Sequence, residues 1–275
     1  MKIKTLLSIS LLAFLLTACA EPQRKNDPIP NSTPNVTPNS IPSNVPVEPP
    51  KSETQGIEDQ LLEKHYEGFT LWLDCKERAA VKFRYNAQRD NGNEPREEKF
   101  TLDPDVPKDC QQKNGKTYGK KYDRGHQVPA NHMDFSAVAI KQSNYMTNIL
   151  PQAAGMNRGA WLLTEEITEC YRDIDELLIL GGVIWGNNTE DDYFVESHGV
   201  RTPDAFWKVI IRGKDEVIAW IIPNSQEAKR KNLDEYLTTV ANIEEITGMK
   251  IPVTGDARTR KLKSSWLIPR GCKKG

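Results

Sequence analysis

Asp123-Arg124-Gly125-His126-Gln127-Val128-Pro129-Ala130 is the stretch from which the organisation of this chain is best understood. It places one imidazole beside a guanidinium and a carboxylate at a turn that a glycine loosens. Histidine can take a proton near neutral pH, the planar fork of arginine can hold a phosphate oxygen, and glycine lets the backbone come close to a substrate. The combination favours phosphodiester chemistry, and the alternative is an exposed turn whose charges are only solvated.

A second polar block follows downstream, Thr147-Asn148-Ile149-Leu150-Pro151-Gln152 and then Met156-Asn157-Arg158-Gly159-Ala160-Trp161. Asn157, Trp161 and Glu165 are spaced i, i+4 and i+8, which predicts that they project from one face of a helix. The amide oxygen of asparagine is a hard ligand, and such ligands suit Mg²⁺, which keeps most of its waters and needs few protein ligands. In the alternative interpretation Asn157 is a helix N-cap and Trp161 belongs to the core.

Together the two blocks resemble the DNA/RNA non-specific endonuclease family, the sugar-non-specific nucleases with a ββα-metal site that include endonuclease G. The family carries an Asp-Arg-Gly-His segment, a Thr/Ser-Asn-Ile-x-Pro-Gln stretch, and then Asn, Trp and Glu on a helix. The resemblance covers about residues 66–252. It implies a strand that carries His126, a loop or hairpin, and a helix that begins near Asn157.

The roles of the candidate residues follow from this resemblance. His126 would be the general base for an attacking water, Asn157 would hold Mg²⁺, with Mn²⁺ as a substitute, and Glu165 would orient water on the metal. Three further residues would hold phosphate oxygens or support the site by hydrogen bonding: Arg124 and Arg96, and Asn148. The expected reaction is metal-dependent endonucleolytic hydrolysis of phosphodiester bonds.

The expected substrates are DNA and RNA bound through the phosphate backbone, because such a site needs neither base contacts nor the 2′-hydroxyl. Two alternatives stay open: a narrower phosphodiesterase, and an envelope lipoprotein whose nuclease-like domain only binds nucleic acid. A protein inhibitor cannot be identified from the sequence. Two groups of basic residues are candidate phosphate contacts: Lys108, Lys113, Lys116, Lys120, Lys121 and Arg124, and Arg258, Arg260, Lys261, Lys263, Arg270, Lys273 and Lys274.

The N-terminus predicts export and a lipid anchor. Lys2 and Lys4 precede an apolar run that ends in Leu16-Thr17-Ala18-Cys19, which resembles a bacterial lipobox. We therefore expect a signal peptide over 1–18, a lipidated Cys19 with a disordered Pro/Asn/Ser-rich linker over 19–55, and the endonuclease domain over 56–275. The expected location is the cell envelope, bound to a membrane through Cys19. By resemblance to lipoprotein sorting signals, Ala20 favours the outer membrane.

Net charge does not favour bulk attraction to nucleic acid. The formal net charge is −1, and removal of residues 1–18 would take away Lys2 and Lys4 and bring it to −3. Attraction to phosphates would therefore depend on local clusters of basic residues.

Hydrophobic patterning predicts an α+β fold, a mainly antiparallel central sheet flanked by helices. Val81, Phe83 and Tyr85 alternate with Lys82 and Arg84, which indicates a strand with one buried face. The apolar run over 177–184 predicts a central strand, and the segments 206–212 and 217–222 predict an antiparallel hairpin. Helices are predicted over Asn157–Arg172 and over Ser225–Thr239, the second with Ser225 as its cap.

The remaining cysteines and histidines are also informative. Apart from Cys19 there are four cysteines, Cys75, Cys110, Cys170 and Cys272, and an even number in an exported domain predicts two disulfides. Spacing does not choose among the three pairings, and a zinc site is the rival interpretation. We expect His132 to support the loop rather than to bind metal, and His65 and His198 to lie on the surface.

Overall fold

The computed structural model describes residues 60–272. The expected signal peptide, the lipidated Cys19 and the expected linker lie outside these residues, and so do Lys273 and Lys274. Within the described part, no helix combines the length and the apolar character that a membrane span requires.

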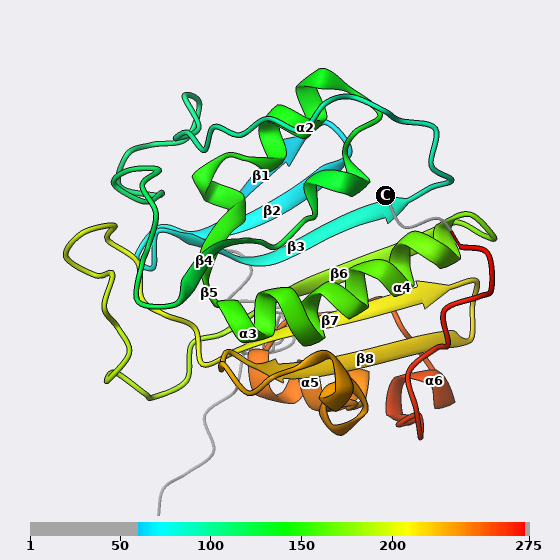
Figure 1. The fold of residues 1–275 in the computed structure, drawn as a ribbon. Helices are drawn as coiled ribbons and strands as arrows, with labels where there is room; N and C mark the ends of the chain where they lie inside the picture. Colours follow the sequence, from blue (N-terminus) through cyan, green and yellow to red (C-terminus); the bar gives the residue numbers. More distant parts are fainter. Residues whose placement is uncertain (1–59, 273–275) are drawn as a thin grey trace, which may run out of the picture. The chain divides into compact units, whose positions relative to one another are not determined.

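A six-stranded antiparallel sheet forms the centre of the fold (Figure 1). Its spatial order is β1-β2-β3-β6-β7-β8, and each neighbouring pair is antiparallel. The bounds are β1 Leu62–Tyr66, β2 Phe69–Asp74, β3 Ala79–Ala87, β6 Leu177–Ile184, β7 Ala205–Arg212 and β8 Glu216–Pro223. The predicted α+β class is confirmed. The predicted central strand is β6, and the predicted hairpin is β7 and β8.

The strand β3 differs from the prediction at one residue. Arg84 is exposed, as the alternation predicts, but Lys82 is buried. The Lys82 ammonium donates to the carbonyl of Lys250 and lies 4.8 Å from the centroid of the Trp72 ring. A lysine can occupy a covered face when its stem packs on apolar groups and its head finds an acceptor.

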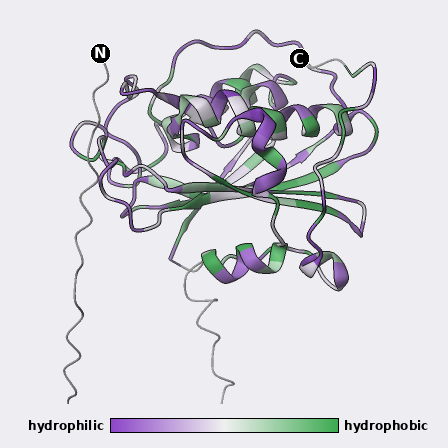
Figure 2. Ribbon diagram, turned by 60° about the horizontal axis from the view of Figure 1, so that its bottom comes forward, coloured by the Kyte–Doolittle hydropathy of each residue, from purple (hydrophilic) through white to green (hydrophobic). Residues whose placement is uncertain are grey.

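Both faces of the sheet are covered, which explains why β6 is apolar along its whole length and why β7 is apolar except for Lys208 and the terminal Arg212. Figure 1 shows the helices α3 and α4 crossing the sheet, and Figure 2 shows helical segments on both of its sides. Trp161, Trp207 and Trp220 are fully buried. Burial of each aromatic side chain contributes about 2 to 3 kcal/mol from the apolar area removed from water.

A two-stranded ribbon stands apart from the main sheet and carries the His126 segment. It pairs β4, Tyr122–His126, with β5, Ile149–Ala153, so that His126 lies opposite Ile149. The connection contains three short helical segments: η1 Ala130–His132, α2 Ala137–Ser143 and η2 Met146–Asn148. Ser136 caps α2 by accepting from the backbone N–H groups of Val138 and Ala139.

The site helix begins earlier than predicted. It consists of α3 Ala154–Met156, a π-helical turn η3 Asn157–Trp161, and α4 Leu162–Arg172. Asn157 has helical dihedral angles, φ −54° and ψ −48°, so it does not open the helix and is not its N-cap. Two contacts fix the start of this helix. The backbone N–H of Ala154 donates to the carbonyl of Lys121, and the backbone of Gly155 lies against the backbone of Gln226. A Cβ at Gly155 would lie only 2.1 Å from the Gln226 carbonyl oxygen.

The helix predicted over Ser225–Thr239 is wrong. The chain instead forms the 3₁₀ helix η4 over Arg230–Tyr236, and α5 over Val240–Thr247 with Thr239 as its N-cap. The physical reason is an interaction with the sheet: Leu237 forms a β-bridge to Trp220, and the Thr238 N–H donates to Ala219. An extended backbone at this point cannot continue a helix. A last short helix, α6, covers Asp256–Thr259.

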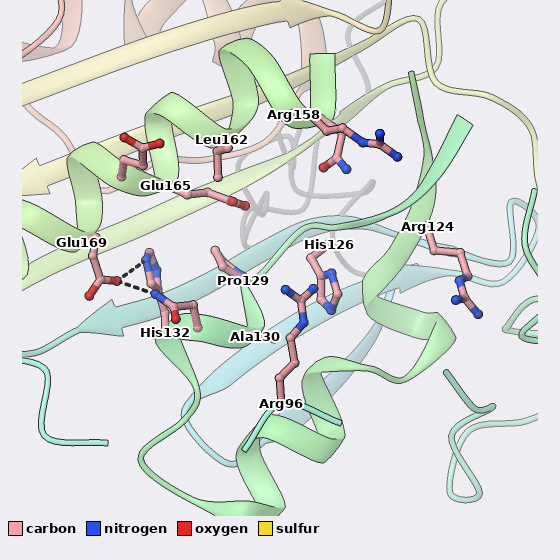
Figure 3. A pocket seen from close by; sticks show the side chains of 13 residues that line it. Arg96, Arg124, His126, Pro129, Ala130, His132, Arg158, Leu162, Glu165 and Glu169 are labelled. Atoms are coloured by element: carbon pink, nitrogen blue, oxygen red, sulfur yellow. Dashed lines mark hydrogen bonds and ion pairs between the residues drawn. The ribbon is translucent and has the colours of Figure 1, made fainter. Parts of the chain in front are cut away.

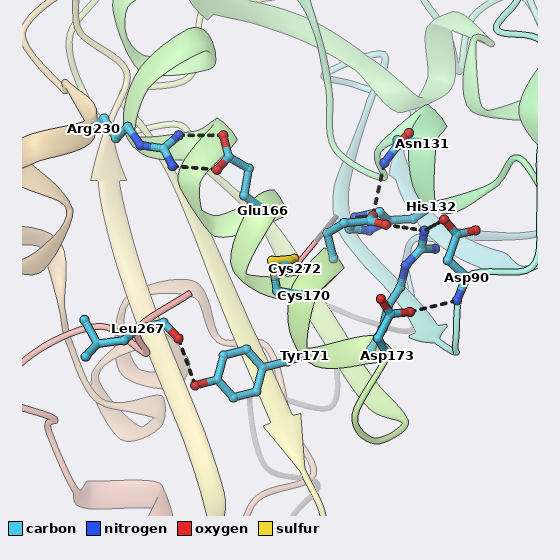
Figure 4. Close-up of a disulfide and its surroundings, with 12 residues drawn as sticks. Asp90, Asn131, His132, Glu166, Cys170, Tyr171, Asp173, Arg230, Leu267 and Cys272 are labelled. Carbon is cyan, nitrogen blue, oxygen red and sulfur yellow. Dashed lines mark hydrogen bonds and ion pairs between the residues drawn. A yellow bond between two sulfur atoms is a disulfide. The ribbon is translucent and has the colours of Figure 1, made fainter. Parts of the chain in front are cut away.

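Two disulfides are present, as predicted, and the zinc alternative is wrong. The pairs are Cys75–Cys110 and Cys170–Cys272, with sequence separations of 35 and 102 residues. The second joins the C-terminal segment to α4, where the Tyr171 hydroxyl also donates to the carbonyl of Leu267 (Figure 4). The C-terminal segment is therefore fixed to the helix that carries Glu165.

Candidate active site

A pocket of about 290 Å³ opens between the β4–β5 ribbon and the site helix. Its lining includes five of the predicted site residues: Arg96, Arg124, His126, Asn157 and Glu165. Figure 3 shows Glu165 projecting from α4 toward His126, with Arg96 on the opposite wall. Segments that are 69 residues apart in the sequence thus meet in one cavity, as the numbering from Arg96 to Glu165 shows.

The backbone around His126 is tightly held. A Cβ at Gly125 would lie 2.2 Å from the Gln152 side chain, so only glycine fits between the two strands here. The His126 carbonyl accepts from the Trp161 indole N–H at 3.1 Å. The ribbon is therefore fastened directly to the π-helical turn, and Trp161 is a core residue, as the alternative interpretation expected.

The tautomer of His126 follows from its contact with Asn144. The Nε2 atom of His126 lies 2.8 Å from Oδ1 of Asn144, and the Asn144 Nδ2 donates to the carbonyl of Glu97. That second bond determines which end of the amide faces the imidazole. Because an amide oxygen only accepts, Nε2 must carry the proton, and the lone pair of a neutral ring is then on Nδ1.

His126 is in its neutral, basic form at physiological pH. Burial lowers its pKa to about 4, and the nearby Arg96 and Arg124 act in the same direction, while the hydrogen bond to Asn144 acts against them. The side chain is only 8% exposed. Burial disfavours the charged imidazolium, so the ring is available to accept a proton.

Arg124 is fixed in place rather than free in solvent. Its guanidinium carbon lies 3.9 Å from the centroid of the Phe100 ring, and Nη1 donates to the carbonyl of Gly115 at 2.9 Å. Phe100 also packs against the ring of His126, with centroids 5.5 Å apart. Arg124 and Arg96 give their part of the pocket, opposite the glutamates of α4, a positive charge that suits a phosphodiester.

Asn148 does not line the pocket but lies fully buried behind it. Its Oδ1 accepts from the Val128 N–H, and its Nδ2 donates to the carbonyls of Val128 and Ser143. All three of these backbone groups belong to the connection between β4 and β5. Asn148 therefore holds the segment that follows His126, which agrees with the predicted supporting role.

The amide of Asn157 is oriented by Asp123. Its Nδ2 donates to Oδ2 of Asp123 at 2.9 Å, and the same carboxylate binds Arg158 through Nε and Nη2 at 2.8 and 2.6 Å. With Nδ2 committed to Asp123, the Oδ1 atom is the end of the amide available to a ligand in the pocket. The Asp123 carboxylate thus positions the amide of Asn157.

The π-helical turn changes which residues share a face. The helix residues that line the pocket are Asn157, Arg158, Leu162, Glu165, Glu166 and Glu169. The step from Asn157 to Leu162 is five residues, as a π-helical turn requires, instead of the predicted four. Asn157 and Glu165 still face the cavity, but Trp161 does not line it. Such turns are frequent at functional sites.

Glu165 lies half-buried beside two cations. Burial raises its pKa to about 7, and Lys208 and then Arg96 lower it. Lys208, on β7, is fully buried; its ammonium donates to the hydroxyl of Thr164 at 2.8 Å and lies 3.6 Å from the centroid of Trp161. Burial lowers the pKa of Lys208 to about 8, with Glu165 acting in the opposite direction. The carboxylate and the buried ammonium are therefore electrostatically coupled.

The donor set fits a hard, hydrated cation such as Mg²⁺. The amide oxygen of Asn157 faces the pocket, and the Glu165 side chain lines the same pocket. Over residues 60–272, no group of three or more His, Cys, Asp or Glu side chains could enclose a metal ion. Mg²⁺ needs no such cage, because it retains several waters and uses one or two protein ligands.

His132 supports the loop, as predicted, through a buried polar network. Its Nδ1 lies 2.9 Å from the Tyr85 hydroxyl, and its Nε2 lies 3.1 Å from Oε2 of Glu169. Glu169 also accepts from Asn131 and from Arg172. His65 is exposed, as predicted. The surface prediction for His198 is wrong: it is buried against Tyr118, and its ring bonds to Ser197 and to the Lys116 carbonyl.

Sequence reasoning missed Asn144, the role of Asp123, and Lys208. Asn144 lies 18 positions after His126, at the end of a short helix, and nothing in its local pattern marks it. Lys208 could have been noticed in the sequence, because it is a single charged residue within the apolar segment Phe206–Ile211. A charge in a buried strand requires a partner, and here the partners are Thr164 and Glu165.

Comparison with known proteins identifies the family and agrees with the fold. Residues 50–256 match the model of the DNA/RNA non-specific endonuclease family. This match covers well over half of the chain, and the chain belongs to that family.

Several individual relatives are mitochondrial nucleases. Nuclease 1 of Schizosaccharomyces pombe is 30% identical over 172 residues, which cover 55% of this chain and 52% of that protein. Endonuclease G of Homo sapiens is 25% identical over 217 residues, 73% of each chain. The chain thus spans about half the length of Nuclease 1 and of the human Nuclease EXOG. The solved EndoG/EndoGI complex contains a chain with the same fold, with a TM-score of 0.55 and 19% identity over 74% of this chain and 93% of that one.

Proposed function

We propose that the chain is a metal-dependent endonuclease that hydrolyses phosphodiester bonds of DNA and RNA with little preference for sequence or sugar. The observation that carries the proposal is His126, a neutral imidazole whose Nδ1 is unprotonated, in a pocket that also holds Arg96, Arg124 and Asn157. Membership of the endonuclease family supports the same conclusion.

Each residue of the site has a separate role in the reaction. His126 takes a proton from a water molecule through Nδ1 while the water oxygen forms a bond to phosphorus. The bond from phosphorus to the 3′ oxygen breaks, and that oxygen leaves. Arg96 and Arg124 hold the non-bridging phosphate oxygens, on which negative charge accumulates. Asn148 and Trp161 keep His126 at its place on the ribbon.

Asn157 would hold the metal through Oδ1, and Glu165 would accept hydrogen bonds from water near it. A bound Mg²⁺, or Mn²⁺ in its place, supplies positive charge for the leaving 3′ oxygen and the pentacovalent phosphorus. Asp123 orients the amide of Asn157, and Lys208 favours the ionised form of Glu165.

Indifference to base and sugar is supported by the nature of the lining. The charged and amide groups named above are suited to phosphate and metal, and phosphate contacts carry no sequence information. Incubation of the purified full chain with plasmid, linear duplex, single-stranded DNA and RNA, with and without Mg²⁺, tests the proposal. We expect cleavage of all four only with the metal. Binding without cleavage would instead support a nucleic-acid-binding module, and cleavage of only one class would support a narrower phosphodiesterase.

We also propose that Cys19 is lipidated and anchors the enzyme to a membrane of the cell envelope, on the basis of the Leu16-Thr17-Ala18-Cys19 junction. Intact-mass spectrometry of the mature protein should find acyl mass on Cys19 and no residues 1–18. An unmodified mature N-terminus at another residue would contradict this.

A further inference from the structure

A row of side chains continues the site along β4 beyond the pocket. Because side chains alternate along a strand, Tyr122, Arg124 and His126 project from the same face. Contacts agree with this for Arg124 and His126, which both pack on Phe100, while Tyr122 packs on the buried ring of Phe194. Tyr122 lies about 13 Å from His126 along the strand at ~3.3 Å per residue.

The far end of this row carries an exposed aromatic ring with a cation on it. Tyr193 is 46% exposed, although its ring edge is supported by Tyr122 and by the buried Phe194. The ammonium of Lys120 lies 4.2 Å from the centroid of the Tyr193 ring. A large ring that is held in place yet open to solvent is a surface on which a nucleobase can stack.

The turn that presents Lys120 has an unusual backbone. Gly119, Lys120 and Lys121 all have positive φ, 76°, 51° and 68°, and lysine rarely adopts this conformation. The turn is held by bonds to the Lys121 carbonyl from the Ala154 N–H and the Gln226 side chain, each 2.9 Å long. Backbone strain of this kind persists where the surroundings enforce it, and it is concentrated at functional sites.

The position relative to the pocket indicates what the surface binds. Figure 3 shows Arg124 and Arg158 at the end of the pocket away from Glu169, and Arg124 is the neighbour of Tyr122 in the row. Arg124 is thus a cation between the scissile site and the end of the row where Tyr122 meets Tyr193, whereas Arg158 is paired with Asp123. A chain of phosphates with bases attached is a ligand that matches cations, here Arg124 and Lys120, on either side of an aromatic face.

We propose that Tyr193 and Lys120 form a remote subsite for the nucleic-acid strand whose phosphate occupies the pocket. In it, one base, several nucleotides from the scissile bond, stacks on the Tyr193 ring, and the Lys120 ammonium moves from the ring to an adjacent phosphate. The subsite makes binding depend on substrate length and favours strands whose bases are unpaired. This inference rests on the proposed function, because the pocket must hold the scissile phosphate.

The test compares single-stranded oligonucleotides of two, four, eight and twelve nucleotides, each with a fluorescent label, as substrates of the full-length protein. For Tyr193→Leu we expect kcat/KM to fall about 5- to 150-fold on the 12-mer, the range for one lost base stack. On the dinucleotide it should be unchanged. Tyr193→Phe keeps the ring and should retain the wild-type length dependence.

A matched pair of substitutions tests the cation. Lys120→Asn and Lys121→Asn each remove one positive charge from the same turn, and asparagine tolerates positive φ. Only Lys120 lies over the ring. We expect Lys120→Asn alone to weaken the length dependence and to lower the salt dependence of 12-mer binding by about one ion. Equal effects of the two variants would overturn the subsite.

Failure of the subsite can be separated from failure of the proposed function. Binding of the 12-mer is measured by fluorescence anisotropy in EDTA, where no cleavage is expected, alongside cleavage with Mg²⁺. A wild-type protein that cleaves normally, with Tyr193→Leu equal to it on every length in both assays, overturns the subsite only. A wild-type protein that cleaves no substrate overturns the proposed function instead.

Discussion

Nε2 of His126 and Oδ1 of Asn144 lie 2.8 Å apart, and this contact determines which nitrogen of the imidazole can act as a base. The bond from Asn144 Nδ2 to the Glu97 carbonyl prevents the amide from turning over. The proton is therefore held on the nitrogen that faces Asn144, away from the reaction.

The first prediction concerns this tautomer. Long-range ¹⁵N–¹H NMR of the metal-free protein at pH 6.5 should show His126 neutral, with its proton on Nε2. Asn144→Leu, which removes the acceptor, should release the tautomer and lower kcat by about 10²-fold, the usual cost of a misplaced catalytic group. A His126 ring protonated on Nδ1 in the wild-type protein would contradict the proposed role.

A second prediction separates the two partners of Asp123. Asp123→Ala releases the amide of Asn157, so the Mg²⁺ concentration for half-maximal activity should rise about 10- to 100-fold, as for other losses of a group that orients a metal ligand. Arg158→Ala is the matched control, because it removes the ion pair and leaves the Asp123–Asn157 bond. The account is contradicted if the control raises the Mg²⁺ requirement as much as Asp123→Ala does.

A third prediction is that Lys208→Met stabilises the fold and lowers the activity. The folded pKa of Lys208, about 8, is below its unfolded value, so the unfolded state binds more protons between about pH 8 and 10.5. The cost of burying the charge, about 3 kcal/mol, is therefore greatest below pH 8 and vanishes as the pH rises. The stability advantage of Lys208→Met in urea unfolding should shrink in the same way.

The functional consequence of Lys208→Met has the opposite sign. The Lys208 ammonium lowers the pKa of Glu165 more than any other charge does. Its loss therefore raises this pKa, and a larger fraction of Glu165 is protonated at pH 7. Activity should fall at pH 7 and recover toward pH 9. A variant with unchanged activity across this range would show that Lys208 does not influence Glu165.

A fourth prediction concerns the disulfides. In the loop-closure model they contribute about 4 kcal/mol for the 35-residue separation and about 5 kcal/mol for the 102-residue separation. The double substitution of Cys170 and Cys272 by alanine should therefore lower Tm more than that of Cys75 and Cys110. Thiol titration of the denatured, unreduced domain should find none of these four cysteines free, and four reactive thiols would refute the pairing.

Much of the sheet could be predicted because its pattern is local. The apolar run of β6 and the Gly213 turn between β7 and β8 are each visible within a few residues. The helix predicted over Ser225–Thr239 was wrong because the deciding contact, Leu237 with Trp220, joins segments that the helical pattern cannot relate. Periodicity describes one segment at a time, whereas a β-bridge depends on a neighbour brought close by the fold.

The site was predictable where chemistry and spacing occur together, and not where support comes from a distance. His126, Asn157 and Glu165 stand in recognisable blocks, and the structure brings them to one pocket. Asn144 and Lys208 act through a single contact each, from the end of a short helix and from a central strand. The π-helical turn at Asn157 was also not predictable, because it results from how the helix packs rather than from residue type.

The most direct test of the central claim is a plasmid-nicking time course that compares the wild-type protein with His126→Ala across Mg²⁺ concentrations, with circular dichroism to confirm folding. Loss of the base should lower the rate about 10²- to 10⁴-fold without preventing DNA binding, and added imidazole should restore part of it. Asn157→Ala should show no such rescue, because it lacks a metal ligand. The account predicts Mg²⁺-dependent cleavage that requires His126. Near wild-type cleavage by a folded His126→Ala protein, or cleavage by the wild-type protein without metal, would contradict it.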